Sequence, residues 1–125
     1  MIAIDSSSFI AYLSGAGGSD VAAVDAALAE RQACVPPVVL SELLSDPKLP
    51  VAVLELLRQL PLLAVSDGYW ERAGVLRGRV IAGGRRAPLA DALIAQSCLD
   101  HDVPLVTRDR DFRHFERVSR LKLSL

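Results

Sequence analysis

The amino-acid sequence predicts an α/β fold in which a mostly parallel sheet is flanked by helices. Short apolar runs of strand length alternate with longer segments that have helical apolar spacing, and this alternation is typical of βαβ units. The chain has 125 residues, 51% of them hydrophobic, which suits one domain over residues 1–125 with a substantial core. No internal repeat, low-complexity tract or interdomain linker interrupts the pattern.

The elements of the first half follow from apolar runs and from their breakers. In order we expect a strand at 1–5, helices at 6–14 and 19–31, a strand at 33–35, and helices at 37–45 and 50–60. Ser19 or Asp20 is expected to cap the second helix, because short polar side chains accept hydrogen bonds from helix N-termini. Pro36 and Pro37 suit the start of the third helix, and Pro47 ends it.

The second half repeats the alternation. In order we expect a strand at 62–65, a long helix to residue 82, a helix at 88–100, a buried strand at 104–107, a short helical turn at 110–115, and an edge strand at 117–124. Ser66 and Asp67 are expected to cap the long helix, and Pro88 to open the next one. The segment between these two helices contains Gly83 and Gly84 and is predicted to be a loop.

Charge is unevenly distributed along the chain. The net charge is −1, but residues 1–71 carry −6 and residues 72–125 carry +5. The stretch from 72 to 90 holds five arginines and no acid: Arg72, Arg77, Arg79, Arg85 and Arg86. Such asymmetry indicates a polyanionic partner, although a solvated helix face would give the same composition.

Membrane, secreted and zinc-binding classes are disfavoured. No uncharged run reaches the roughly 20 apolar residues of a membrane-spanning helix, and no basic segment precedes an apolar one at the N-terminus. We therefore expect a cytoplasmic protein without membrane association. The spacing of Cys34 and Cys98 fits no zinc motif, and both are expected to be small buried hydrophobes.

Four acidic residues are candidates for one site. Asp5 and Asp109 follow predicted strands, Asp91 lies in the first turn of a predicted helix, and Glu42 lies among apolar residues of another helix. The carboxyl ends of parallel strands meet at the edge where α/β proteins bind ligands. Taken singly, each acid could be a cap, turn or surface residue. An ionised carboxylate within an apolar run is costly unless something pairs with it, and a divalent cation would pair with all four.

Such a carboxylate set suits Mg²⁺ or Mn²⁺, which take oxygen ligands. Two ions about 3.5–4 Å apart could activate water and stabilise the leaving oxygen of a phosphodiester, and the number of ions stays open. Without a metal the carboxylates would repel one another, so the metal-free protein should be less stable than the metal-bound form.

The order and spacing of four segments resemble the PIN-domain ribonucleases, specifically the small toxins of VapBC-type toxin–antitoxin pairs. The segments are Ile4-Asp5-Ser6-Ser7, Val39-Leu40-Ser41-Glu42-Leu43-Leu44, Ala90-Asp91-Ala92-Leu93-Ile94-Ala95 and Leu105-Val106-Thr107-Arg108-Asp109-Arg110-Asp111-Phe112. The resemblance covers nearly the whole chain and implies a PIN-like three-layer sandwich with four to five strands. It also implies metal-dependent endonucleolytic cleavage of structured cellular RNA, such as tRNA, rRNA or mRNA, and inhibition by a cognate antitoxin. A homodimer is expected.

The resemblance assigns Asp5, Glu42, Asp91 and Asp109 as metal ligands. It places Ser7 and Thr107 in supporting roles, orienting Asp5 or the turn that carries Asp109. Asp111 could also reach the metal. The candidate RNA contacts are arginines, because aromatic residues are only 5% of the chain: Arg77, Arg79, Arg85, Arg86, Arg108 and Arg110. His101 and His114 could suggest a general base, which a metal mechanism does not need.

Two other functions fit parts of the sequence pattern. A receiver-like signalling domain also gathers acids and Mg²⁺ at strand ends, but residues 62–65 lack the phosphoacceptor Asp it would need, and Lys48 and Lys122 are misplaced for its lysine. A catalytically inactive PIN interaction module would keep the acids for structure alone.

Overall fold

The computed structural model describes residues 1–124 and contains a sheet of four parallel strands in the order β2-β1-β3-β4. The strands are β1 (Ile2–Ile4), β2 (Ala33–Cys34), β3 (Leu105–Val106) and β4 (Leu123–Ser124). Ala3 pairs with Cys34 on one side and with Leu105 on the other. The predicted α/β class with a mostly parallel sheet is therefore confirmed.

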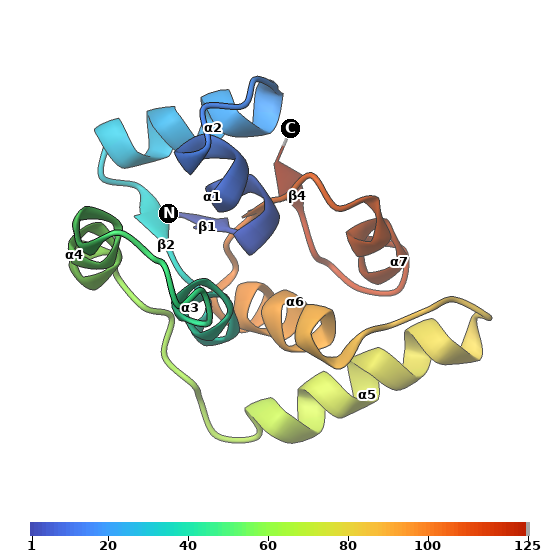
Figure 1. The fold of residues 1–125 in the computed structure, drawn as a ribbon. Coiled ribbons are helices and arrows are strands. Elements are labelled where there is room, and N and C mark those ends of the chain that lie inside the picture. The colour runs from blue at the N-terminus through green and yellow to red at the C-terminus, as the bar shows by residue number, and fades with distance from the viewer. Residues whose placement is uncertain (125) are drawn as a thin grey trace.

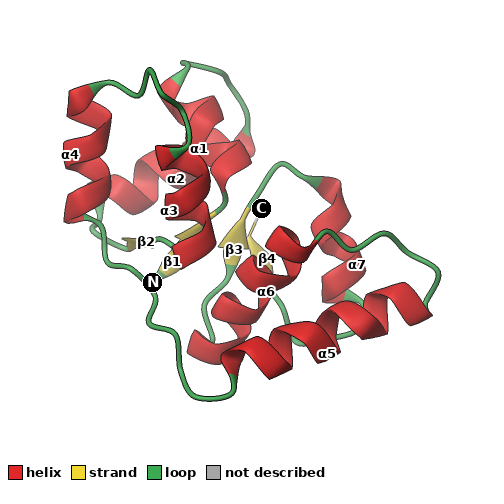
Figure 2. Ribbon diagram, turned by 60° about the horizontal axis from the view of Figure 1, so that its bottom comes forward, coloured by secondary structure: helices red, strands yellow, loops and turns green. Residues whose placement is uncertain are grey.

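Helices lie on both sides of this sheet, as a three-layer sandwich requires. They are α1 (Ser6–Leu13), α2 (Ser19–Ala29), α3 (Pro37–Leu44), α4 (Val51–Gln59), α5 (Tyr69–Ala82), α6 (Leu89–His101), the 3₁₀ turn η1 (Arg110–Phe112) and α7 (Arg113–Glu116). Figure 1 shows α2 on one side of the sheet and α6 on the other, with α5 packed along α6. Figure 2 shows the short strands at the centre, between the helices. No helix in the described part of the chain is long and apolar enough to cross a membrane.

The core is built on the two central strands. Ala3, Ile4, Leu105 and Val106 are fully buried, because helices cover both faces of the parallel sheet. Aromatic and branched side chains of the helices complete the core, with Phe9, Val24, Val39, Ile94, Phe112 and Phe115 almost inaccessible to solvent. Cys34 and Cys98 are buried free thiols, as expected, and burial raises the pKa of both. These contacts fix the strand ends on which the site is built.

Two predicted strands are wrong in extent. Residues 62–65 form a single bridge between Leu62 and Val35 rather than a strand. Val35 exchanges hydrogen bonds with Pro61 and Leu63, after which the chain leaves the sheet with Leu62 and Val65 half exposed. The edge strand expected at 117–124 is limited to Leu123–Ser124.

The predicted helix caps are also wrong. Helices α2 and α5 begin after Gly18 and Gly68, whose φ angles of 136° and 81° favour glycine, and neither helix has a side-chain cap. The side chain of Ser66 instead donates to Asp100. The carboxylate of Asp20 accepts hydrogen bonds from Ser8 and Arg108, which lie outside α2.

Candidate metal centre

Asp5 lies immediately after β1 and is only 5% exposed. It occupies the N-cap position of α1 but makes no capping hydrogen bond, so the cap interpretation of this residue fails. Its Oδ2 atom instead accepts hydrogen bonds from the hydroxyls of Ser7, at 2.7 Å, and Thr107, at 2.8 Å. Two hydroxyls thus fix the orientation of a buried carboxylate at the end of the central strand.

Asp109 lies just beyond the end of β3, next to β1. Its backbone N–H donates to the Thr107 hydroxyl at 3.0 Å, and its Oδ1 atom accepts from the N–H of Asp111 at 2.9 Å. Thr107 therefore joins the turn of Asp109 to the carboxylate of Asp5. The side chain of Asp111 points to His114, with 3.9 Å between Oδ1 and Nε2.

Asp91 is the third residue of α6 and is partly buried. Its pKa is raised to about 7, first by burial and then, in decreasing order, by the negative charges of Asp109, Asp5, Glu42 and Asp111. Coulombic effects of this kind decay with distance, so the four other carboxylates lie near enough to Asp91 to repel its negative charge. This electrostatic coupling is consistent with the predicted convergence, and the hydrogen bonds that join Asp5 to the turn of Asp109 through Thr107 add direct contacts.

The environment of Glu42 differs from the apolar one that the sequence predicts. Helix α3 turns Val39 and Leu43 into the core and leaves Glu42 exposed, so the cost of burial does not apply to this carboxylate. Its Oε1 atom accepts a 2.6 Å hydrogen bond from Ser6, at the start of α1. Glu42 thus lies at the rim of the acidic region, held there by a serine that the sequence analysis did not single out.

The five carboxylates do not form a ready-made cage. Within residues 1–124, no three His, Cys, Asp or Glu side chains are close enough to hold a metal ion as they stand. One oxygen each of Asp5, Glu42 and Asp109 is engaged by a serine, a threonine or a backbone N–H. The donor set nevertheless fits a hard divalent cation, because it consists of oxygens and concentrates negative charge around Asp91.

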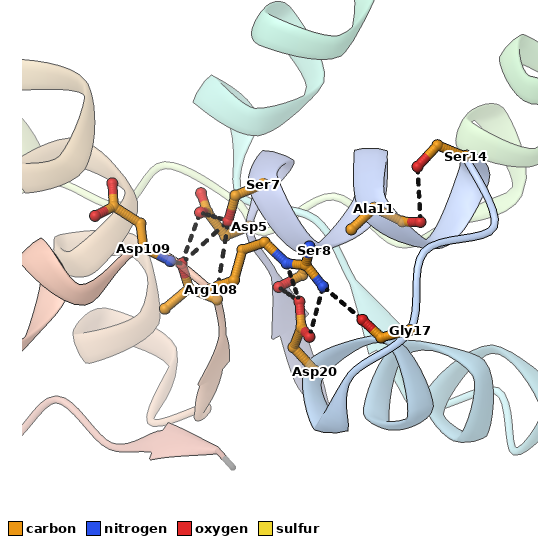
Figure 3. Close-up of polar contacts among 10 residues, drawn as sticks. Asp5, Ser7, Ser8, Ala11, Ser14, Gly17, Asp20, Arg108 and Asp109 are labelled. Carbon is orange, nitrogen blue, oxygen red and sulfur yellow. Dashed lines mark hydrogen bonds and ion pairs between the residues drawn. The ribbon is translucent and has the colours of Figure 1, made fainter.

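A second polar network borders the acidic residues and was missed by the sequence analysis. Figure 3 shows Arg108 between Asp20 and Gly17: Nε and Nη2 donate to the Asp20 carboxylate at 2.8 and 3.0 Å, and Nη2 donates to the Gly17 carbonyl at 3.1 Å. Ser8 donates to the same carboxylate at 2.8 Å. The Arg108 hydrogen bonds hold the pKa of Asp20 well below its ordinary value. The partners are 88 positions apart in the sequence, so no local sequence signal could have revealed the pair.

The structure does not bring the predicted RNA-contacting arginines to one place. Arg108 and Arg110 lie beside Asp109, and Arg113, which sequence reasoning missed, lies with them. The other candidates are elsewhere: Arg77 donates to the Ala87 carbonyl at 2.7 Å, Arg79 lines a separate pocket, and Arg85 and Arg86 are exposed in the loop before α6. His101, one of the two histidines that could suggest a general base, lies at the C-terminal end of α6 and forms a hydrogen bond with the Ala64 carbonyl.

The parallel sheet and the acidic residues at its carboxyl edge define an α/β domain with a candidate metal centre. The chain belongs to the PIN-domain family, which matches residues 2–118. This membership argues against the receiver-like alternative. A comparison with curated proteins finds no match.

Similar solved structures include toxin–antitoxin assemblies from three bacteria. VapBC2 from Rickettsia felis, bound to a promoter DNA fragment, has a TM-score of 0.77 at 20% identity, covering 99% of this chain and 98% of the other. VapBC-5 from Mycobacterium tuberculosis has a TM-score of 0.70 at 22% identity, with coverages of 98% and 95%. A toxin–antitoxin complex from Klebsiella pneumoniae has a TM-score of 0.69 at 20% identity, covering 90% of each chain. At these identities the similarity establishes the fold.

Proposed function

We propose that this protein is a Mg²⁺- or Mn²⁺-dependent endoribonuclease toxin that cleaves structured cellular RNA and is held inactive by a cognate antitoxin. The observation that carries the proposal is the position of Asp5 and Asp109 at the ends of the paired strands β1 and β3, joined through the Thr107 hydroxyl, with Asp91 near enough for their charges to raise its pKa. Such mutual repulsion lowers stability, so a site that retains it is a candidate for cation-dependent chemistry.

The chain's own residues prepare this site. Asp5, Asp91 and Asp109 would be the principal ligands, with Glu42 joining from the rim. Bound divalent cations would supply Lewis-acid activation of water and charge stabilisation at the leaving oxygen. Ser7 and Thr107 hold Asp5 in one orientation, and burial of Asp5 keeps its carboxylate out of bulk water.

The proposed partners follow from the family and from the similar assemblies. An antitoxin protein is supported because the similar structures include VapBC and other toxin–antitoxin complexes. Exposed apolar side chains offer surface for an antitoxin or a second copy of the chain, among them Trp70 at 63% and Val75 at 58% exposure on α5. A homodimer and a cytoplasmic location complete the proposal.

The direct test is cleavage of purified tRNA, rRNA and mRNA with sequencing of the new RNA ends. Cleavage should require Mg²⁺ or Mn²⁺, stop with EDTA and be lost in Asp5→Asn and Asp91→Asn. Asp25→Asn, the same change on the exposed side of α2, is the matched control and should retain activity. Cleavage that persists in Asp5→Asn and Asp91→Asn contradicts the proposal. A wild-type protein that binds the cation but cuts no RNA would favour the inactive interaction module instead.

A further inference from the structure

A small pocket lies beside the acidic residues, at the carboxyl ends of β3 and β4. It has a volume of about 190 Å³ and is lined by Ser19, Asp20, Thr107, Arg108, Asp109, Arg110, Arg113, Leu123 and Ser124. Drug-sized ligands need roughly 300 Å³ or more, whereas a water occupies about 30 Å³. The pocket therefore suits a single small group with a few waters rather than a whole nucleotide.

The charge of the pocket is set by three arginines and two aspartates. The ion pair between Arg108 and Asp20 neutralises one arginine and one aspartate. It also fixes the Arg108 side chain, which follows β3, against the first turn of α2. Within residues 1–124, the side chains of Arg110 and Arg113 make no hydrogen bond or ion pair, and both residues are exposed. Two guanidinium groups are thus available against the one remaining carboxylate, Asp109.

Hydroxyl groups and a helix end add to the preference for an anion. Ser19 is the first residue of α2, an eleven-residue helix whose N-terminal N–H groups and dipole favour negative charge. Ser124, at the end of β4, also lines the pocket. Guanidinium groups and hydroxyls around a small space match the oxygens of a phosphate group.

We infer that this pocket is a phosphate subsite that receives one non-scissile phosphodiester of the RNA strand, bound chiefly by Arg110 and Arg113. The inference rests on the proposed function. Asp109 belongs to both the pocket and the acidic region, so a strand seated in the pocket continues directly toward the metal centre. The subsite would position the strand without reading its bases, because phosphate contacts carry no sequence information.

The subsite can be tested by RNA binding that does not depend on cleavage. Fluorescence anisotropy would follow a short mixed-sequence oligoribonucleotide binding to Asp91→Asn, which the proposed function makes inactive, between about 50 and 200 mM salt. Adding Arg110→Gln and Arg113→Gln should weaken binding about tenfold and reduce the magnitude of the salt slope by about 0.7, the loss of one phosphate contact on a single strand.

The matched control is Arg120→Gln with Lys122→Gln, which removes the same charge from the larger pocket at the amino ends of β3 and β4. That control should change affinity no more than about twofold. A series of oligonucleotides, each with one uncharged methylphosphonate at a different linkage, should identify the bound phosphate. At one linkage the substitution should weaken binding only when Arg110 and Arg113 are present.

The subsite would be overturned if the pocket variant and the control variant lost the same RNA affinity, or if no linkage behaved in this way. An absence of RNA binding would also overturn it. If wild-type protein cleaves no RNA but the pocket variants alone lose binding, the subsite stands and the nuclease proposal fails.

Discussion

Replacing Asp91 by Asn should stabilise the metal-free protein at alkaline pH. The pKa of Asp91 is raised from 3.8 to about 7, so the folded state resists ionisation that the unfolded chain accepts freely. A group with a raised folded-state pKa contributes stability below the unfolded pKa and loses it as pH rises through the folded pKa. Wild-type protein should therefore lose stability between about pH 4 and 7, and the variant should avoid that loss.

The size of the effect follows from the shift. At about 1.36 kcal/mol per pKa unit, a rise from 3.8 to about 7 corresponds to at most about 4 kcal/mol. Because Asp91 is only partly buried, solvent screening reduces this to about 2 kcal/mol. The variant also loses a carboxylate in the first turn of α6, where the helix dipole favours negative charge by about 0.5 kcal/mol. We expect a net gain of about 1–2 kcal/mol at pH 8.

The assay is urea unfolding in EDTA at pH 4, 5 and 8, followed by circular dichroism. Asp25→Asn is the control, because it makes the same chemical change on the exposed face of α2. The difference between Asp91→Asn and wild type should be near zero at pH 4 and grow toward pH 8, while Asp25→Asn stays nearly flat. A variant that is equally or less stable than wild type at pH 8 would refute the electrostatic argument.

Three further predictions concern the supporting structure. Ser7→Ala removes a hydroxyl that orients Asp5 and should weaken Mn²⁺ binding about tenfold in calorimetry, with an unchanged affinity counting against this role. Asp20→Asn should lower the melting temperature above pH 4 by breaking the pair with Arg108. Because the pKa of Asp20 is depressed, the difference should shrink as pH falls below about 4, and a constant difference would contradict the linkage. Phe9→Ala empties a fully buried position and should cost about 3–5 kcal/mol in urea unfolding, whereas a loss under about 1 kcal/mol would contradict tight packing there.

Sequence periodicity was sufficient to predict the parallel sheet and the positions of Asp5 and Asp109 at neighbouring strand ends. Both features depend on local apolar runs and on the polar residues that end them. The strand expected at 62–65 was wrong because an apolar run cannot show whether the chain continues along the sheet or leaves it after one bridge.

The site illustrates the same limit at the level of side chains. The acidic residues could be predicted because their spacing resembles a known family, but the exposure of Glu42 depends on which face α3 turns to the core. The pairing of Asp20 with Arg108 and the position of Arg113 depend on tertiary contacts across most of the chain. Local sequence supplies no signal for either.

The central claim is that carboxylates from separate elements bind a divalent cation together. Calorimetric titration of Mn²⁺ into metal-free protein tests it most directly, with wild type compared with Asp5→Asn, Asp109→Asn and the control Asp25→Asn. Our account predicts saturable binding to wild type and Asp25→Asn and at least a tenfold loss in the other two variants. Equal Mn²⁺ affinity in all four proteins, or no binding to wild type, would contradict it.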